Sequence, residues 1–487
     1  MKHLLFIDGQ WQESKTTAKI LSPFTGDTAA ESCQADDSQI EKAIAACVNA
    51  THPFSKTSRF LRSKLLMAIA QGLQESRAEI VNSMIQEAGK PWLLSDTEVT
   101  RAIQTFTWAA EEVKRFGGEV VPMDVDAGGR PFSEATCLFK PRGPILGITP
   151  FNFPLNLVAH KVAPALAVGC PILIKSAPQA PGGAALLAKI FEKAAKSVNA
   201  EHGAGREAIP MAALQVLACS NPQAEILVKD PRLPTVSFTG SPGVGFRIQG
   251  SAIGKKVILE LGGNAGVIVH EDADLSRAAA RCAFGGMSYA GQTCISVQRI
   301  FVHEKVAAEF EKLLTAEVGK VKHGDPSQKD VIVGPVIDSK AAERIEAWIQ
   351  EAKQDPRTKV LAGGTRNKNV VAPTLLLNPP SQSKISCEEV FGPVITLSTY
   401  KTFQEAIVQV NDSKFGLQAG VFTRDSDRIH QAFENLEVGG VLVNEVPTFR
   451  ADHMPYGGVK QSGLGREGLK YAMEEFCERR ILVQYRG

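Results

Sequence analysis

Long apolar runs and paired cysteines are both absent from this sequence of 487 residues. No stretch approaches the roughly 18 apolar residues of a membrane span. The first twelve residues do not combine a cationic segment with an apolar core, as a secretory signal does. The nine cysteines are scattered, with no C-x-x-C pair. We therefore expect free thiols, a reducing compartment and a cytoplasmic protein, with neither a disulfide framework nor a zinc site.

An excess of charge of either sign is also lacking. The chain has 54 Lys and Arg against 52 Asp and Glu, a net charge of +2 at pH 7. A nucleic acid or a membrane surface would need a strong basic patch, so neither is expected as a partner. A local basic site for a small anion is still compatible with this balance. The histidines show no metal-ligand spacing, so no metal is expected.

The apolar residues that are present fall into short runs separated by segments of helix length. This pattern predicts α/β lobes with parallel sheets buried on both faces, as in doubly wound nucleotide-binding domains. A second set of runs follows the paired glycines Gly262 and Gly263, so we expect a second lobe of similar texture. The runs of the first set are 145–148, 170–174, 214–217, 235–238 and 257–261, and those of the second include 266–269, 300–302, 394–395, 421–422 and 441–443.

Cys294 is the main candidate for chemistry. It follows the turn residues Gly291 to Thr293, between a helical pattern over 275–289 and the apolar run 300–302. A thiol displayed there, close to the expected boundary between lobes, is accessible to a ligand and needs little activation to act as a nucleophile. A small buried hydrophobic residue is the alternative interpretation of a single cysteine.

Other polar residues stand where α/β ligands bind. Glu260 closes an apolar strand, where desolvation would raise its pKa and suit a general base; an acid satisfied by backbone donors is the alternative. Asn152, between aromatic residues and prolines, is a candidate oxyanion donor or a turn-stabilising residue. Lys175 is a cation at a strand end or a surface lysine. The Gly/Ser turn over 237–245 offers N–H groups to a phosphate, or is a plain turn.

Taken in order, these segments resemble the aldehyde dehydrogenase superfamily, the NAD(P)-dependent enzymes with a catalytic cysteine. The resemblance runs nearly end to end, and eight motifs in one order are far more specific than any one alone. The motifs are Pro150-Phe151-Asn152-Phe153-Pro154, Lys175, Phe238-Thr239-Gly240-Ser241 through Gly245, Leu259-Glu260-Leu261-Gly262-Gly263, Gly291-Gln292-Thr293-Cys294, Glu389-Val390-Phe391-Gly392-Pro393, Asn411 with Phe415-Gly416-Leu417, and Pro455-Tyr456-Gly457-Gly458 with Gly465-Arg466-Glu467-Gly468.

The resemblance implies a role for each matching residue. Cys294 would attack the aldehyde, and Asn152 with the backbone N–H of Cys294 would hold the oxyanion. Glu260 would activate Cys294 or the water that hydrolyses the thioester, and Glu467 would assist proton relay. Lys175 and Glu389 would hold ribose hydroxyls, Ser241 would contact the pyrophosphate, and Phe391 would pack near the nicotinamide. The implied cofactor-binding set is Thr149, Pro150, Phe151, Lys175, Pro178, Phe238, Thr239, Gly240, Ser241, Gly245, Leu261, Gly262, Glu389 and Phe391.

The resemblance also implies an architecture. A Rossmann-like cofactor lobe would comprise residues 1–120 and 143–262, and a catalytic lobe residues 263–463. A small β arm for oligomerisation would comprise 121–142 and 464–487, giving a homodimer or homotetramer, because an unpaired strand edge is best covered by a partner.

Two positions depart from the family pattern. Pro178 stands where many NAD-preferring members carry an acid that binds the adenosine ribose. Without that carboxylate a 2′-phosphate is not repelled, so NADP should be tolerated or preferred. Asn264 replaces a frequent lysine, and the sequence offers no account of its effect.

The substrate is expected to be a small, polar or anionic aldehyde. The segment 448–456 is similar to that of lactaldehyde, phosphonoacetaldehyde and non-phosphorylating glyceraldehyde-3-phosphate dehydrogenases. Arg450, with Arg101 and His160, would hold a carboxylate, phosphate or phosphonate, although a structural salt bridge is an equal alternative for Arg450. Thr293 replaces an arginine of some phosphate-selective relatives, which disfavours a phosphorylated substrate.

Three other functions stay open at this stage. A CoA-acylating dehydrogenase would transfer the thioester to CoA and would not need Glu260 as a base. A cysteine hydrolase would pair Cys294 with a histidine and would turn over without a nicotinamide cofactor. A protein that keeps the fold without the activity is disfavoured, because Cys294, Glu260 and Asn152 are all present.

Overall fold

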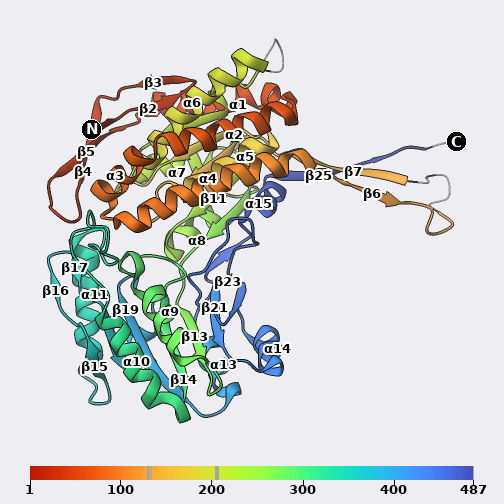
Figure 1. Cartoon of the computed structure of the whole chain (residues 1–487). Coiled ribbons are helices and arrows are strands. Elements are labelled where there is room, and N and C mark those ends of the chain that lie inside the picture. The colour runs from red at the N-terminus through yellow and green to blue at the C-terminus, as the bar shows by residue number, and fades with distance from the viewer. Residues whose placement is uncertain (129–131, 133, 203–207, 486–487) are drawn as a thin grey trace.

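The computed structural model describes residues 1–128, 132, 134–202 and 208–485. The chain forms two lobes stacked on each other, and a thin arm leaves one side of the molecule (Figure 1). Each lobe is built on a large, mostly parallel sheet. The predicted α/β class is confirmed, with antiparallel strands added at the sheet edges.

The sheet of the first lobe has eight strands and is covered by helices on both faces. Side chains at alternating positions of the same strands enter two separate cores, one under α2 to α6 and one under α1, α7 and α8. This is why its strands are continuous apolar runs. The strand order is β24 (Gly463–Leu464), β12 (Lys256–Glu260), β11 (Thr235–Thr239), β8 (Ile145–Ile148), β9 (Ile172–Lys175), β10 (Leu214–Leu217), β2 (Leu5–Ile7) and β3 (Gln10–Gln12). The helices are α1 (Asp37–Lys56), α2 (Arg59–Glu75), α3 (Arg77–Ala88), α4 (Trp92–Arg115), α5 (Asn156–Val168), α6 (Gly182–His202), α7 (Asn221–Lys229) and α8 (Pro242–Ser251).

The second lobe has a seven-stranded sheet with the same double winding. The strand order is β15 (Lys359–Ala362), β18 (Thr374–Leu377), β19 (Val394–Tyr400), β14 (Val297–His303), β13 (Ala265–Val269), β21 (Gln418–Phe422) and β22 (Gly440–Val443). The helices are α9 (Leu275–Met287), α10 (Ala307–Gly319), α11 (Ser339–Ala352), α12 (Lys384–Cys387), α13 (Phe403–Asn411) and α14 (Ser426–Asn435). Small pairs and a three-stranded sheet complete the fold: β1 (Lys2–His3) with β5 (Thr28–Gln34) and β4 (Thr16–Leu21), β16 (Arg366–Asn367) with β17 (Val370–Val371), and β20 (Phe415–Gly416) with β23 (Val459–Lys460).

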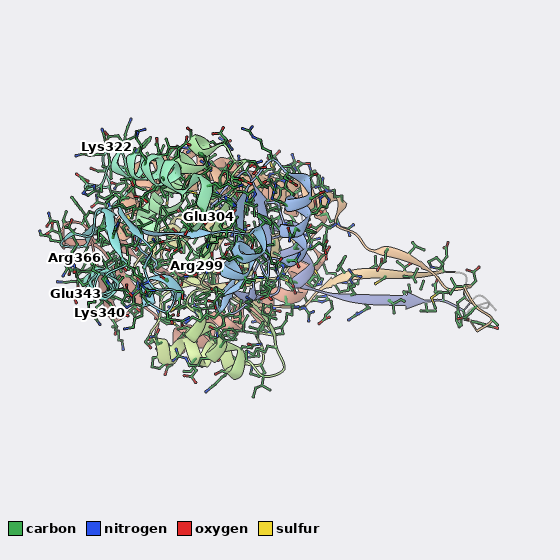
Figure 2. The ribbon with its side chains drawn as sticks, turned by 90° about the horizontal axis from the view of Figure 1, so that it is seen from below. Arg299, Glu304, Lys322, Lys340, Glu343 and Arg366 are labelled. Carbon is green, nitrogen blue, oxygen red and sulfur yellow. The ribbon has the colours of Figure 1, made fainter. Side chains whose placement is uncertain are left out.

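The arm is an antiparallel sheet of β6 (Glu119–Pro122), β7 (Glu134–Pro141) and β25 (Cys477–Val483). It extends well beyond the body of the protein (Figure 2). The helix before its last strand, α15 (Leu469–Glu475), packs instead on α4 and α5 of the first lobe. Residues 129–131, 133 and 486–487 of the predicted arm, and 203–207 of the first lobe, lie outside the described residues.

The two lobes bring the polar candidates together. The loops after β8, β11 and β12 leave the carboxyl ends of parallel strands at one edge of the first sheet, which is where α/β proteins bind ligands. The turn between α9 and β14 approaches this edge from the second lobe. None of the described helices is long and apolar enough to cross a membrane.

Candidate active site

Cys294 follows a turn with an uncommon backbone. After α9 the chain passes through Tyr289, Ala290 and Gly291 with φ of 54°, 52° and 67°, three successive left-handed residues. A side chain at Gly291 would clash with the carbonyl of Gly392. Left-handed non-glycine residues are strained and occur mainly where the surrounding structure enforces them, often at functional sites. The turn presents Cys294 with a backbone N–H that has no hydrogen-bond partner in the described part of the chain.

The thiol of Cys294 lines a cavity of about 290 Å³ between the lobes. Burial raises the pKa of this thiol to about 12, while a hydrogen bond with Tyr456, 3.0 Å from Sγ to Oη, opposes that rise. A thiol of this kind needs a base before it can act as a nucleophile. The cavity is also lined by most of the residues singled out in the sequence: Arg101, Pro150, Phe151, Asn152, Thr239, Gly240, Ser241, Glu260, Leu261, Gly262, Thr293, Glu389, Phe391, Arg450 and Glu467.

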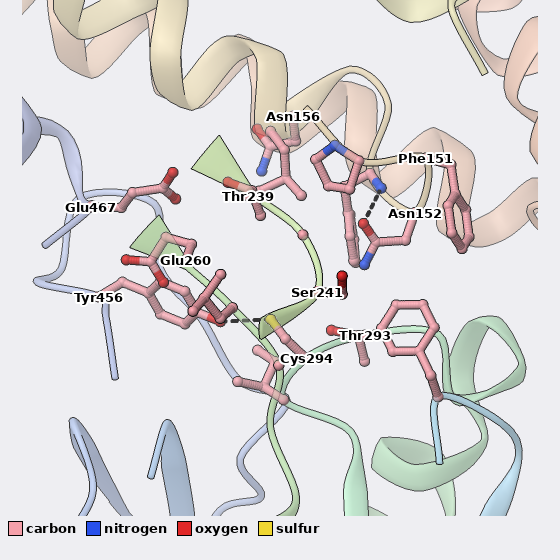
Figure 3. A pocket seen from close by; sticks show the side chains of 18 of the residues that line it. Phe151, Asn152, Asn156, Thr239, Ser241, Glu260, Thr293, Cys294, Tyr456 and Glu467 are labelled. Carbon is pink, nitrogen blue, oxygen red and sulfur yellow. Dashed lines mark hydrogen bonds between the residues drawn. The ribbon is translucent and has the colours of Figure 1, made fainter. Parts of the chain in front are cut away.

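Asn152 lies across the cavity from Glu260 and Tyr456 (Figure 3). Its amide nitrogen donates to the carbonyl of Gln292, 3.0 Å away, and its amide oxygen accepts from the N–H of Phe153. These bonds fix the orientation of the amide and occupy one of its two N–H groups. The other remains for an oxyanion formed on a Cys294 adduct.

A buried ion pair supports the loop that carries Asn152. Lys90 donates to the carbonyl of Asn152 at 3.0 Å and pairs with Glu98. Glu98 in turn accepts from the backbone N–H groups of Leu155 and Asn156, each at 2.9 Å. The loop is therefore held at both ends by side chains that the sequence did not single out.

Glu260 ends β12 and is 3% exposed. Neither carboxylate oxygen has a hydrogen-bond partner among the described residues. Burial first, and the negative charge of Glu467 second, raise the pKa of Glu260 well above its ordinary value of 4.5. An unpaired buried carboxylate with a raised pKa is suited to take up and release a proton.

Glu467 is equally buried but fully paired. Its two oxygens accept from Lys161 and from Arg450, each at 3.1 Å. Burial alone would raise the pKa of Glu467, but the two cations outweigh it and lower this pKa to about 2. Lys161 also donates to the hydroxyls of Ser237 and Thr239. Glu467 is thus a permanent negative charge that holds Arg450 in place.

Of the three residues considered for an anionic substrate, Arg101 and His160 share Asp452, and Arg450 contacts His160. Arg101 donates to both oxygens of Asp452, at 3.2 and 2.7 Å, and His160 Nε2 lies 2.8 Å from one of them. His160 is buried and is absent from the cavity lining; its Nδ1 lies 3.4 Å from an Nη of Arg450. Burial, followed by the charge of Arg450, lowers the pKa of His160, so the ring is neutral. Arg450 reaches the cavity, and its buried Nε has no partner within the described chain.

The remaining candidates are the residues expected to bind the cofactor. Lys175, at the end of β9, is 6% exposed and its ammonium makes no hydrogen bond to a described residue. Burial raises the pKa of Glu389 to about 7, although one oxygen accepts from the N–H of Gly263. Ser241 caps α8 without using its side chain. Buried groups left without partners and a free helix N-terminus fit ribose hydroxyls and a pyrophosphate. Thr149, Lys175, Phe238 and Gly245 are buried and absent from the cavity lining, and Pro178 is exposed and also absent from it.

The paired glycines Gly262 and Gly263 leave room for other groups of the protein to pack against the backbone. A side chain at Gly262 would clash with the carboxylate of Glu389, and one at Gly263 with the carbonyl of Cys294. Asn264, whose effect could not be predicted from the sequence, donates to the carbonyls of Ser386 and Glu388 at 3.0 and 2.9 Å. Asn264 therefore ties the loop after Glu260 to the segment that carries Glu389.

Five functional neighbours were missed by the sequence analysis. Tyr456 was quoted within a motif but given no role, and Asp452 lay in the segment thought to border the substrate entrance. Glu98 and Lys161 occur within helices and Lys90 between two helices, and only the fold shows their burial. A lysine in an otherwise apolar stretch, as in α5, was the single available signal for Lys161. No cluster of potential metal ligands occurs among the residues that the structure describes.

Comparison with known proteins identifies the family of this chain. The model of the aldehyde dehydrogenase family matches residues 11–482. The chain belongs to that family, and the predicted resemblance is confirmed. It is an oxidoreductase that oxidises an aldehyde to a carboxylic acid with a nicotinamide cofactor. Solved relatives use NAD or NADP.

Particular relatives resemble the chain over nearly its whole length. The 3-sulfolactaldehyde dehydrogenase of Priestia megaterium is 39% identical, covering 98% of this chain and 97% of the relative. An aldehyde dehydrogenase from Physcomitrella patens, solved with its reaction product succinate, has a TM-score of 0.94 and 38% identity over 99% of this chain and 98% of the relative. The glyceraldehyde-3-phosphate dehydrogenase GapN of Methanocaldococcus jannaschii, complexed with NADP, has a TM-score of 0.90 and 34% identity over 96% and 99%.

Proposed function

We propose that this aldehyde dehydrogenase acts on a small aldehyde carrying an anionic group, through a thioester on Cys294 that water hydrolyses. The observation that carries the proposal is a single cavity in which a cysteine, an unpaired buried carboxylate, a fixed amide and an arginine converge. These residues are Cys294, Glu260, Asn152 and Arg450.

The chemistry assigned to the residues follows from their surroundings. Glu260 takes the proton of Cys294, and the sulfur attacks the aldehyde carbon. The free N–H of Asn152 and the backbone N–H of Cys294 stabilise the oxyanion of the thiohemiacetal. A nicotinamide cofactor held by Lys175, Glu389 and Ser241 would supply the acceptor for the hydride of the adduct. Glu260, deprotonated again, then removes a proton from the water that attacks the Cys294 thioester, and the acid is released.

Arg450 is proposed to bind the anionic group of the substrate. Arg450 lines the cavity, its Nε has no hydrogen-bond partner among the described residues, and desolvated charge-assisted hydrogen bonds are strong. Arg101 lines the same cavity but is engaged with Asp452, and His160 supports Arg450 from behind. A sulfonate is carried by the substrate named for the Priestia relative, and a carboxylate by the succinate of the Physcomitrella relative. Thr293 lacks the charge that would favour a phosphate.

The cofactor preference is proposed to include NADP. Lys175, Glu389 and Ser241 would hold the ribose and the pyrophosphate. Pro178 is exposed near the end of β9 and contributes no carboxylate, so a 2′-phosphate meets no repulsion there. The NADP complex of GapN is consistent with this preference.

The domain division and the assembly are also proposed. We assign residues 1–120 and 143–262 to cofactor binding, 263–463 to catalysis, and 121–142 with 464–487 to an arm that pairs copies of the chain. The strands of the arm expose Val120, Leu138, Ile481, Leu482 and Val483. An apolar sheet edge this far from the body is best covered by a second copy, in a homodimer or homotetramer.

Two alternatives lose support. A cysteine hydrolase would need a histidine on the thiol, but the only side-chain partner of Cys294 among the described residues is Tyr456. A CoA-acylating enzyme would not need a base for water, whereas Glu260 lines the same cavity as the thiol and has no hydrogen-bond partner among the described residues.

Cofactor reduction, followed at 340 nm, tests the proposal. The panel comprises 3-sulfolactaldehyde, succinate semialdehyde, lactaldehyde, glyceraldehyde 3-phosphate and propanal, each with NAD and with NADP. We expect the sulfonate and carboxylate aldehydes to give the highest kcat/KM and Cys294→Ala to be inactive. Equal rates for propanal and the anionic aldehydes would refute the anion site. Turnover by Cys294→Ala would refute the thioester.

A further inference from the structure

The hydroxyl of Tyr456 contacts the reacting atom, with its Oη 3.0 Å from Cys294 Sγ (Figure 3). We propose that Tyr456 is a further catalytic residue: its hydroxyl donates a hydrogen bond to the Cys294 thiolate, which favours the ionised sulfur and fixes it opposite Asn152. This inference rests on the proposed role of Cys294 as the nucleophile.

The surroundings of Tyr456 leave its hydroxyl little freedom. Its backbone N–H donates to the carbonyl of Glu467, and the N–H of Glu467 donates back, at 3.0 and 2.7 Å. The ring packs in a small apolar cluster with Ile295 and Leu417. The guanidinium of Arg450 lies over the ring, 3.6 Å from its centroid. A buried aromatic ring held by its backbone and by a cation points its hydroxyl at one place, and the sulfur of Cys294 occupies that place.

The direction of the hydrogen bond follows from ionisation. A thiolate can only accept, so the phenol must donate once Glu260 has taken the thiol proton. Burial raises the pKa of Tyr456 well above its ordinary value of 10, so the phenol keeps its own proton. The same hydrogen bond lowers the pKa of Cys294 against the effect of burial. A phenylalanine at this position would keep the ring packing and remove only the donor.

Alkylation of Cys294 by iodoacetamide tests this inference without any cofactor or substrate. The sulfur forms a bond to carbon and iodide leaves, at a rate that follows the thiolate fraction. Modification is quantified on the Cys294 peptide by mass spectrometry between pH 7 and 9. Because a hydrogen bond to a charged group is lost, the thiolate fraction should fall about tenfold. The remaining thiolate is more nucleophilic, so we expect Tyr456→Phe to react about threefold more slowly at each pH. An unchanged or faster rate would overturn the proposal.

Tyr400→Phe is the matched control. Tyr400 is also buried, and its hydroxyl lies 2.7 Å from His270 Nδ1 in the second lobe, away from the cavity lining. We expect its removal to leave the alkylation rate unchanged. If Tyr456→Phe lowers Tm sharply, Tyr456→Met and Tyr456→His replace it. The histidine variant, which keeps a donor, should react faster than the methionine variant; equal rates would overturn the proposal.

Failure of this inference can be told apart from failure of the proposed function. Turnover by Cys294→Ala would show that Cys294 is not the nucleophile, and the proposed function would fail. Normal alkylation of Tyr456→Phe, together with an inactive Cys294→Ala, would exclude only the role of Tyr456. In active enzyme we expect Tyr456→Phe to lower kcat/KM about tenfold without moving the acid limb of its pH profile, because less thiolate forms while Glu260 still sets that limb.

Discussion

Glu260 and Glu467 are two buried carboxylates on the same cavity, and their surroundings are opposite. Glu260 has no hydrogen-bond partner among the described residues, and its pKa is raised. Glu467 is paired with Lys161 and Arg450, and its pKa is lowered to about 2. Environments that shift the pKa values of two carboxyl groups in opposite directions indicate that the two groups have different tasks. Glu260 is suited to proton transfer, whereas Glu467 is suited to organising fixed charges.

The cations around Glu467 explain how a carboxyl group with a raised pKa and one with a lowered pKa occur at the same cavity. Glu467 raises the pKa of Glu260, while Arg450 and Lys161 lower it. Glu467, Arg450 and Lys161 therefore act on the pKa of Glu260 in opposite directions, and none of them forms a hydrogen bond with its carboxylate. Arg450 has a second consequence, because it lies over Tyr456 and so links the proposed anion site to the nucleophile.

Removal of the unpaired carboxylate should have the largest effect. We expect Glu260→Gln to lower steady-state kcat by about 10³-fold, because no base activates the water. The first turnover should also slow, because Glu260 takes the thiol proton, and the acyl group that forms should then remain on Cys294, seen by stopped-flow absorbance at 340 nm and by intact mass. A kcat within tenfold of wild type, without accumulated acyl enzyme, would contradict the assignment of Glu260 as the base.

Removal of the cation that Glu467 holds should come next. We expect Arg450→Met to lower kcat/KM about 100-fold for an anionic aldehyde, through loss of a buried charge-assisted contact. Propanal, which lacks an anion, should lose less than about tenfold. The matched control is Arg101→Met, which removes an arginine already engaged with Asp452. Equal losses for both aldehydes would assign Arg450 a purely structural role.

Neutralisation of Glu467, the paired carboxylate, should shift the pH profile of kcat/KM. Glu467 is ionised throughout the working range, so Glu467→Gln removes a negative charge and leaves Lys161 and Arg450 uncompensated. Both changes favour ionised Glu260, so we expect the acid limb of kcat/KM to move down by about one pH unit. Glu87→Gln is the control, because Glu87 is an equally buried carboxylate that pairs with His3 outside the cavity. An upward movement would contradict the coupling.

The contrast between these carboxylates also separates what the sequence could and could not predict. The α/β lobes and the strand-end positions of Glu260 and Lys175 follow from local apolar patterns, and the structure agrees. The pairing of Glu467 with Lys161 joins residues 306 positions apart, and no local pattern encodes such a contact. The same holds for Arg101 with Asp452, 351 positions apart. Motifs supplied the candidates, but only the fold shows which of them are paired.

The smallest effect should appear in stability, with opposite signs for the two carboxylates. The folded pKa of Glu260 is raised above 4.5. Its favourable contribution is therefore fully present below pH 4.5 and is lost as the pH rises through the folded pKa. We expect Glu260→Gln to raise Tm by about 2 °C at pH 8 and to have little effect at pH 5.

Glu467 should show the reverse. Its folded pKa is depressed from 4.5 to about 2, so its contribution is present above pH 4.5 and is lost as the pH falls through the folded value. Glu467→Gln should therefore lower Tm at pH 8, and the loss should shrink towards pH 3. Differential scanning calorimetry of both variants at several pH values measures the two trends. Parallel trends would mean that the two carboxyl groups share one environment, and the division of labour between Glu260 and Glu467 would fail.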